Sequence, residues 1–241
     1  MALALGLLLL AVACPAQQLG TVTYAHKRYT VCTVDLSKQR LELFWRDGAK
    51  QPFKSFDALN QWLWRKGRKL VFATNAGMYR EDFSPVGLYV EQGKQLRSLN
   101  LARGSGNFCL KPNGVFAITK SGARIVESSQ YPTIKASTTL ATQSGPMLVI
   151  NGRLHPKFSS KSQSRLFRNG VGVVSAQKVV FAITEDAVNF HEFATFFRDR
   201  LKCHNALYLD GSISSLYAPS LKRDDRFSAL GPMLGVTAKA R

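Results

Sequence analysis

Acidic residues are scarce in this chain of 241 residues, which holds 15 Asp and Glu against 33 Lys and Arg, for a formal charge of +18. Two-metal hydrolytic sites need several convergent Asp and His ligands. The four histidines, His26, His155, His191 and His204, share no ligand spacing. A metal-dependent phosphodiesterase is therefore disfavoured. We predict no metal ligand and no cofactor, and the sequence leaves open only a divalent ion near Asp210.

Cysteine is also rare. The four cysteines, Cys14, Cys32, Cys109 and Cys203, show no Cys-x-x-Cys or Cys/His ligand spacing, which disfavours a zinc site. If Cys14 leaves with a cleaved leader, three thiols remain, enough for one disulfide in an oxidising compartment. We predict a disulfide between Cys32 and Cys203, with three buried thiols as the alternative.

Other signatures are missing too. Gly-x-Ser-x-Gly and an obvious Ser/His/Asp order are absent, and Ser105, in Gly104-Ser105-Gly106, lacks the required spacing, so a serine hydrolase is disfavoured. No low-complexity linker or fixed-period repeat divides the chain, which indicates one domain.

The N-terminus is apolar over residues 1–12 and ends in small residues at Ala11-Val12-Ala13. This run is too short to cross a bilayer and is typical of a signal peptide. We predict a signal peptide at 1–16, a domain at 17–241 with no transmembrane segment after the leader, and a periplasmic or secreted protein. A lipoprotein anchored through Cys14 is a less favoured alternative, because Ala11 replaces the expected Leu.

The positive charge favours anionic partners, such as a phosphorylated sugar substrate or an anionic envelope glycan. Lys and Arg are spread along the chain, with one tight cluster at 65–69. Spread charge is typical of a solvated surface, so we predict no dedicated nucleic-acid site.

Short alternating segments dominate the chain. We expect a hairpin from 29–34 and 41–45, another at Asn151-Gly152, and a third from 171–175 and 178–184. Helical spacing is clear at 56–66 and 189–201, and 235–237 is expected as a last edge strand. These signals predict an α+β fold: a single domain with a largely antiparallel or mixed β-sheet, hairpins and a few flanking helices.

Four polar segments differ from ordinary core or loop. Asn75 and Gly77 follow a predicted buried strand, and Asn107 and Lys111 occupy a later loop. A third segment runs from Ser144 through His155 to Arg168 and Asn169. Here Arg168 could clamp phosphate and His155 could donate a proton, although a lone histidine before proline is more often structural.

The fourth segment follows a predicted strand at 206–209. Asp210 leads into a turn with Gly211, Ser212, Ser214 and Ser215, which joins a carboxylate to hydroxyl and backbone N–H donors. The alternative is an Asp that merely caps this turn.

Four motifs together resemble the phosphodiester glycosidase family in their order and spacing. They are Asn-Ala-Gly-Met-Tyr at 75–79, Gln-Ser-Gly-Pro-Met-Leu at 143–148, Arg-Asn-Gly-Val-Gly at 168–172 and Asp-Gly-Ser-Ile-Ser-Ser at 210–215. The resemblance spans nearly all of the chain after the leader and is closest to the bacterial exported branch. It implies hydrolysis of a sugar-1-phosphodiester, with Asp210 as the catalytic carboxylate and His155 assisting proton transfer. The residues implied in substrate and phosphate binding are Asn75, Gly77, Asn107, Lys111, Ser144, Arg168, Asn169, Gly211, Ser212 and Ser214.

Ordinary glycoside hydrolysis uses a second carboxylate, for which Glu185 and Asp186 are candidates. The alternative functions are a non-catalytic binding protein for anionic envelope glycans and an envelope structural protein anchored through Cys14.

Overall fold

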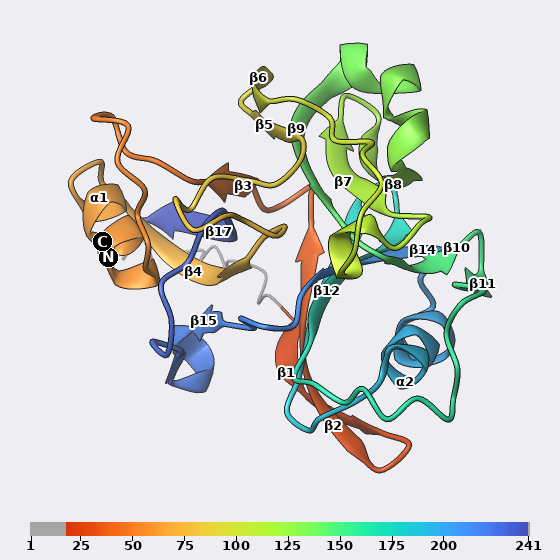
Figure 1. Ribbon diagram of the computed structural model, residues 1–241. Helices are drawn as coiled ribbons and strands as arrows, with labels where there is room; N and C mark the ends of the chain where they lie inside the picture. Colours follow the sequence, from red (N-terminus) through yellow and green to blue (C-terminus); the bar gives the residue numbers. More distant parts are fainter. Residues whose placement is uncertain (1–17, 241) are drawn as a thin grey trace, which may run out of the picture.

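The computed structural model describes residues 18–240, in which three antiparallel sheets surround a common core and two helices flank them (Figure 1). The α+β prediction is confirmed. No described helix is long and apolar enough to span a bilayer. The predicted leader and Cys14 lie outside the described residues.

The largest sheet has seven strands. In spatial order they are β1 (Gln18–Tyr24), β2 (Lys27–Asp35), β13 (Lys178–Thr184), β12 (Asn169–Ser175), β14 (Asn205–Asp210), β10 (Met147–Ile150) and β11 (Arg153–Leu154). Both faces of its central strands are buried: along β2, Tyr29 and Val31 face one core cluster and Cys32 and Val34 face the other. Double burial explains why β13 is almost continuously apolar.

Two five-stranded sheets complete the core. One contains β16 (Arg223–Asp224), β15 (Leu216–Ala218), β4 (Arg68–Asn75), β17 (Met233–Lys239) and β3 (Leu41–Phe44). The other contains β6 (Lys94–Arg97), β5 (Tyr89–Glu91), β9 (Thr138–Ser144), β7 (Gly114–Thr119) and β8 (Gly122–Glu127).

Both expected helices form. In α1 (Phe56–Trp64), Ser55 accepts a hydrogen bond from the Ala58 N–H, and Phe56, Leu59 and Leu63 are buried. The second, α2 (Phe190–Thr195), begins with a capping box between Asn189 and Glu192 and continues as a π-helical turn at Phe196–Arg200. Short 3₁₀ turns lie at Asn107–Cys109, Ser128–Thr133, Lys135–Ser137 and Pro219–Leu221.

The hairpin predictions at Asn151-Gly152 and between β12 and β13 are confirmed. The predicted pairing of 29–34 with 41–45 is wrong, because β2 pairs with β1 and β13 whereas β3 pairs with β17 in another sheet. The strand expected at 235–237 forms, but the prediction that it lies at a sheet edge is wrong. β17 lies between β4 and β3 and pairs with both, and its apolar residues are buried in the core there.

The predicted Cys32–Cys203 disulfide is contradicted. Cys32 faces the core shared by the three sheets, whereas Cys203 packs with Phe197 in the cluster beneath α2, on the opposite face of the seven-stranded sheet. The sheet itself keeps the two thiols apart. Burial raises the pKa of the Cys203 thiol to about 12.

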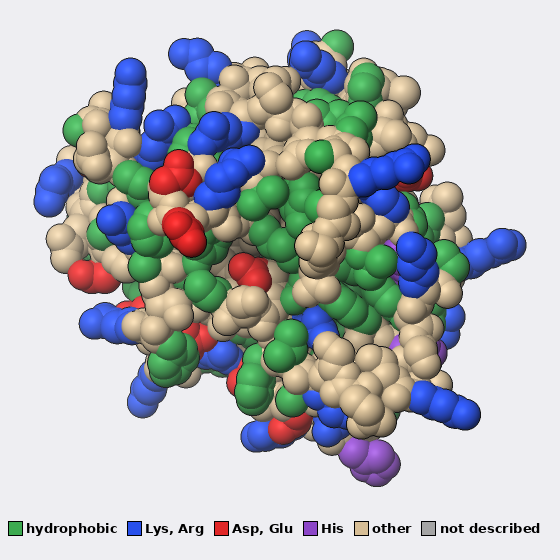
Figure 2. All heavy atoms as spheres, in the orientation of Figure 1, with side chains coloured by type: hydrophobic (Ala, Val, Ile, Leu, Met, Phe, Trp, Pro, Cys, Tyr) green, Lys and Arg blue, Asp and Glu red, His purple; other side chains and the backbone are tan. Residues whose placement is uncertain are grey.

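Lys and Arg side chains stand over much of the face in Figure 2, with few Asp and Glu among them, and they do not form one dense patch there. This distribution agrees with the even spread of basic residues along the sequence.

Candidate active site

Three strand ends meet at one point of the core. β4 ends at Asn75, β12 begins at Asn169 and β14 ends at Asp210, with Asn169 and Asp210 paired in register. The Asn169 side chain joins all three: its Nδ2 donates to Asn75 Oδ1 at 2.9 Å and to Thr74 Oγ1 at 3.0 Å, and its Oδ1 accepts the Asp210 N–H at 2.9 Å. Two distant sequence motifs are thus fixed to the candidate catalytic residue.

The Asn75 side chain holds the serine-rich turn that follows Asp210. Its Oδ1 accepts the Ser215 N–H at 2.9 Å, and its Nδ2 donates to the Ile213 carbonyl at 2.6 Å. Thr74 adds a bond from its hydroxyl to the Ser215 carbonyl. Because Asn75 and Asn169 are both 1% exposed, this network is enclosed in the protein and rigid.

Asp210 is 8% exposed and uses one carboxylate oxygen to hold the turn. Oδ1 accepts the N–H groups of Gly211 at 2.6 Å and Ser212 at 3.0 Å. Burial raises the pKa of Asp210, and the N–H groups of the turn oppose that rise. The Ile213 N–H also acts on this carboxylate. Asp210 therefore caps its own turn, with Oδ1 as the acceptor of the two shortest bonds.

The two predicted glycines mark close approaches. A Cβ on Gly77 would lie 2.4 Å from the Gln143 carbonyl oxygen, and one on Gly211 would lie 1.8 Å from the Tyr208 hydroxyl. Only glycine lets these backbone segments sit where the structure places them.

The predicted serines differ in role. Ser144 is fully buried and donates to the Leu209 carbonyl at 2.8 Å, which ties β9 to the strand that carries Asp210. Ser214 donates to the Phe167 and Asp210 carbonyls, whereas Ser212 is exposed. Of the three, Ser212 is therefore the most accessible to a ligand.

Arg168 is fully buried instead of lining an open surface. Its Nε donates to the Val188 carbonyl at 2.9 Å, its Nη1 to the Tyr208 hydroxyl at 3.4 Å, and its guanidinium stacks 3.9 Å from the centre of the Phe190 ring. Burial lowers its pKa, and no described carboxylate forms an ion pair with it. Arg168 thus reaches the Asp210 region through Tyr208.

Asn107 and Lys111 lie in the loop before β7. The Asn107 side chain lies near the Tyr208 hydroxyl, where it opposes the rise of the Tyr208 pKa, and Lys111 Nζ donates to Asn113 Oδ1 at 3.2 Å. Asn107 is thereby brought close to the Asp210 strand, and Lys111 is half-buried one turn further along.

His155 is buried and stacks on Phe158, with 4.6 Å between the ring centres. Burial lowers its pKa, so the ring is neutral at neutral pH. Its Nδ1 accepts the Lys157 N–H, which leaves the proton on Nε2. Nε2 meets no partner in hydrogen-bonding geometry among the described residues. Phe158 and Phe190 lie between His155 and Tyr208 in a series of ring contacts.

Two tyrosines belong to this site although the sequence pattern assigned them no role. Burial, together with the charge of Asp210, raises the pKa of Tyr79 to about 12 and that of Tyr208 well above its usual value. Tyr208 could have been found from strand alternation, because it lies two residues before Asp210 on the same face of β14.

The candidate second carboxylates are engaged elsewhere. Glu185 accepts from Thr30 Oγ1 at 2.6 Å and pairs with Arg223. Asp186 pairs with Arg28 at 2.9 Å, which lowers its pKa to about 2. No hydrogen bond joins either to Asp210 within residues 18–240.

A cavity of about 840 Å³ opens beside the turn after Asp210, and its volume lies within the usual range of ligand pockets. The serine-rich turn forms one wall, and Glu185 and Arg223 form another. Phe167 and Phe227, both exposed, also line the cavity. Among the described residues no group of three His, Cys, Asp or Glu side chains could hold a metal ion.

Comparisons with known proteins show which family and fold the chain resembles. A family model described as phosphodiester glycosidase matches residues 68–236. The Escherichia coli (strain K12) protein YigE is 37% identical over 185 residues, which are 77% of this chain and 72% of that protein.

Two solved structures share the fold. The zebrafish N-acetylglucosamine-1-phosphodiester alpha-N-acetylglucosaminidase catalytic domain superimposes with a TM-score of 0.65 at 15% identity, covering 90% of this chain and 81% of that one. A protein from Burkholderia pseudomallei K96243 gives 0.55 at 11% identity, covering 87% and 74%.

Proposed function

The chain belongs to the phosphodiester glycosidase family, and from that premise we propose that it hydrolyses a sugar-1-phosphodiester, releasing the sugar and leaving a phosphomonoester. Asp210 is the catalytic carboxylate. The observation that carries this proposal is the convergence of three family-like motifs on Asp210, whose buried carboxylate is fixed by the turn that follows it.

The surrounding groups suggest how the reaction is supported. Burial keeps Asp210 in a low-dielectric setting, where its interaction with developing positive charge on the sugar is strong. The Arg168 cation acts through the Tyr208 hydroxyl, and Asn107 lies near the same hydroxyl. Ser212 and Lys111 offer donors to the substrate, and His155, neutral with its proton on Nε2, can assist proton transfer.

A single free carboxylate is compatible with this chemistry. Glu185 and Asp186 are held in ion pairs, so neither serves as a ready general acid. A phosphate leaving group needs little protonation, which removes the main demand for a second acid. We further propose that the protein acts in the periplasm or outside the cell, on the basis of the apolar leader in its sequence.

The direct test is release of reducing sugar from a panel of sugar-1-phosphodiesters by the purified protein, with and without EDTA. We expect release by the wild type, unchanged by EDTA, and a loss of about 10²–10³-fold or more in Asp210→Asn. Asp199→Asn is the matched control, because it removes one carboxylate whose ion pair among residues 18–240 is with its neighbour Arg198. Full turnover by Asp210→Asn would remove the proposed role of Asp210.

One observation favours the second candidate function, a binding protein for anionic envelope glycans. The protein carries a formal charge of +18, and Glu185 and Asp186 are held in ion pairs, which suits a surface that binds anions without turnover. Measurable affinity for a phosphorylated glycan with no product after long incubation would support this alternative.

A further inference from the structure

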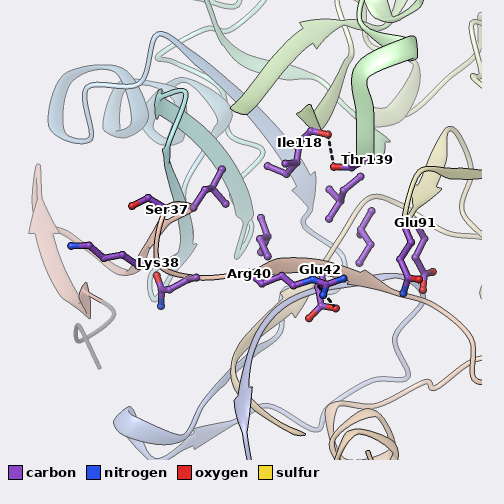
Figure 3. Close-up of a pocket in the computed structure, with 13 residues that line it drawn as sticks. Ser37, Lys38, Arg40, Glu42, Glu91, Ile118 and Thr139 are labelled. Atoms are coloured by element: carbon purple, nitrogen blue, oxygen red, sulfur yellow. Dashed lines mark hydrogen bonds and ion pairs between the residues drawn. The ribbon is translucent and has the colours of Figure 1, made fainter. Parts of the chain in front are cut away.

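Two cavities lie on either side of the turn after β5, and both are lined by Glu91 and Gln92. Figure 3 shows the first, where Arg40 and Glu42 lie together between Lys38 and Glu91. Its charges are largely paired: Arg40 lies 3.5 Å from Glu42, which also binds Arg68, and Lys38 lies 3.7 Å from Asp35. This cavity has no excess charge to offer a ligand.

The second cavity, of about 440 Å³, is different. It is lined by Trp45, Arg46, Asp47, Lys50, Glu91, Gln92, Lys94 and Leu96. None of its three cations, Arg46, Lys50 and Lys94, forms an ion pair among the described residues.

The two carboxylates of this cavity are occupied by their own neighbours. Asp47 Oδ1 accepts the N–H groups of Ala49 and Gln51, both at 2.9 Å, and Glu91 Oε2 accepts the Tyr89 hydroxyl at 3.0 Å. Arg46 still acts electrostatically on Glu91. With three cations and two carboxylates, the lining keeps an excess of one positive charge.

Two buried donors also lack an acceptor: one is on Trp45, which lines this cavity, and the other is on Arg97, which lies beside the Trp45 ring but outside the lining. Trp45 is 4% exposed, and neither its Nε1 nor the Nε of Arg97 has a hydrogen-bond partner among the described residues. The guanidinium carbons of Arg46 and Arg97 lie 3.6 and 5.6 Å from the centre of the Trp45 ring. Buried donors without partners are costly and uncommon in folded proteins, so an acceptor that reached the Trp45 N–H from the cavity would be stabilised there.

We infer that the Trp45 cavity binds a phosphate group of an anionic polymer, at a site that shares no residue with the Asp210 centre. Phosphate accepts several N–H donors at once and matches guanidinium in bidentate fashion. A neutral sugar is a poorer fit, since it would need an open aromatic face and Arg46 covers the Trp45 ring. The exposed Lys50 and Lys94 can contact further phosphates along a polymer.

The position of the cavity suits a polymer that also visits Asp210. Phe44, next to Trp45 in the chain, pairs with Met233, which pairs with Asn75. Two strand spacings, about 10 Å, therefore separate this part of β3 from the end of β4. The inference itself needs no turnover, so it stands or fails independently of the proposed hydrolysis.

The test is calorimetric titration of the full chain with long-chain polyphosphate. Lys50→Gln/Lys94→Gln is compared with Lys161→Gln/Lys178→Gln, because each double change removes two exposed lysines that form no ion pair with the part of the chain that the structure describes. We expect the first pair to weaken binding about tenfold and to flatten its salt dependence, and the second to change it less than about twofold. Equal losses in both pairs would mean diffuse surface charge and would overturn the site.

A second measurement follows the indole N–H signals of the three tryptophans by NMR during titration with inorganic phosphate. The Trp45 signal, assigned with Trp45→Phe, should move on binding while those of Trp62 and Trp64 stay. A stationary Trp45 signal at saturation would overturn the role of its N–H. Binding confined to phosphatidylglycerol vesicles, with no affinity for polyphosphate, would overturn the assignment to a polymer.

Discussion

Around Asp210, the buried amides of Asn75 and Asn169 use both their oxygen and their nitrogen, whereas beside Trp45 two buried N–H groups have no acceptor among the described residues. The first region is complete as it stands: each strand end is held by another, and the turn after Asp210 is held by Asn75. The second has fixed donors and unpaired cations around a cavity.

This difference separates two ways of building a site. A satisfied network holds a reactive group in place before any ligand arrives, which is what catalysis by a single carboxylate requires. Unsatisfied donors instead leave free energy to be gained when a ligand binds. The contrast predicts that removing a polar group is costly in the first region and nearly free in the second.

The largest effect is expected for Asn169→Ala. It leaves the Asp210 N–H without an acceptor and opens a void between three strand ends, so we expect a loss of about 1–3 kcal/mol in the free energy of unfolding, together with most of the activity. Urea unfolding measures the loss of stability, and the sugar-release assay measures the loss of activity. Asn189→Ala, which removes a helix cap, should cost about 1 kcal/mol and leave activity intact. An Asn169→Ala protein as stable and active as the wild type would show that the network is dispensable.

A smaller effect of opposite sign is expected for Asp210→Asn. Burial raises the Asp210 pKa, so folding favours its protonated form, and the folded state loses stability as the pH rises from the unfolded pKa through the folded one. The neutral amide removes this loss, and the variant should gain about 0.5–2 kcal/mol at pH 7 while it loses activity. The gain should shrink as the pH falls toward 4.

Unfolding of both proteins at pH 4 and pH 7 checks this sign. The matched control is Asp199→Asn. Arg198 lowers the pKa of Asp199, so folding favours its charged form and its removal should bring no gain at pH 7. A destabilised Asp210→Asn would mean that the bonds from the turn to Oδ1 outweigh the burial of the charge.

Local signals in the sequence predicted the parts of the fold that local forces decide. Asn151 and Gly152 both have positive φ, 48° and 76°, as a two-residue hairpin requires, and the spacing of Phe56, Leu59 and Leu63 defines α1. The partner strands of β2 and of β3 could not be predicted in this way, because these two strands are neighbours in sequence but enter different sheets. The Cys32–Cys203 prediction failed for the same reason: the face on which each thiol lies depends on the whole sheet.

The sequence named several residues that the structure brings together, but it did not predict their geometry. Asn75, Asn169 and Asp210 meet as the motifs suggested, but the depth of Arg168 depends on Phe190 and Val188, which come from a later segment. The Trp45 region gave no signal in the sequence, since an unpaired donor is a property of three-dimensional packing alone.

The smallest effect is expected for Arg97→Met, which keeps the length of the side chain beside Trp45 and removes a donor that has no partner among the described residues. The free energy of unfolding should change by less than about 0.5 kcal/mol. Arg223→Met is the contrasting change, because its guanidinium binds Glu185 and Asp225, and its removal should cost more. Adding phosphate should raise the melting temperature of the wild type and of Arg223→Met but not that of Arg97→Met, since a ligand stabilises only the protein that binds it. If Arg97→Met loses as much stability as Arg223→Met without phosphate, the Nε of Arg97 already has a partner in solution, and the two regions are built alike.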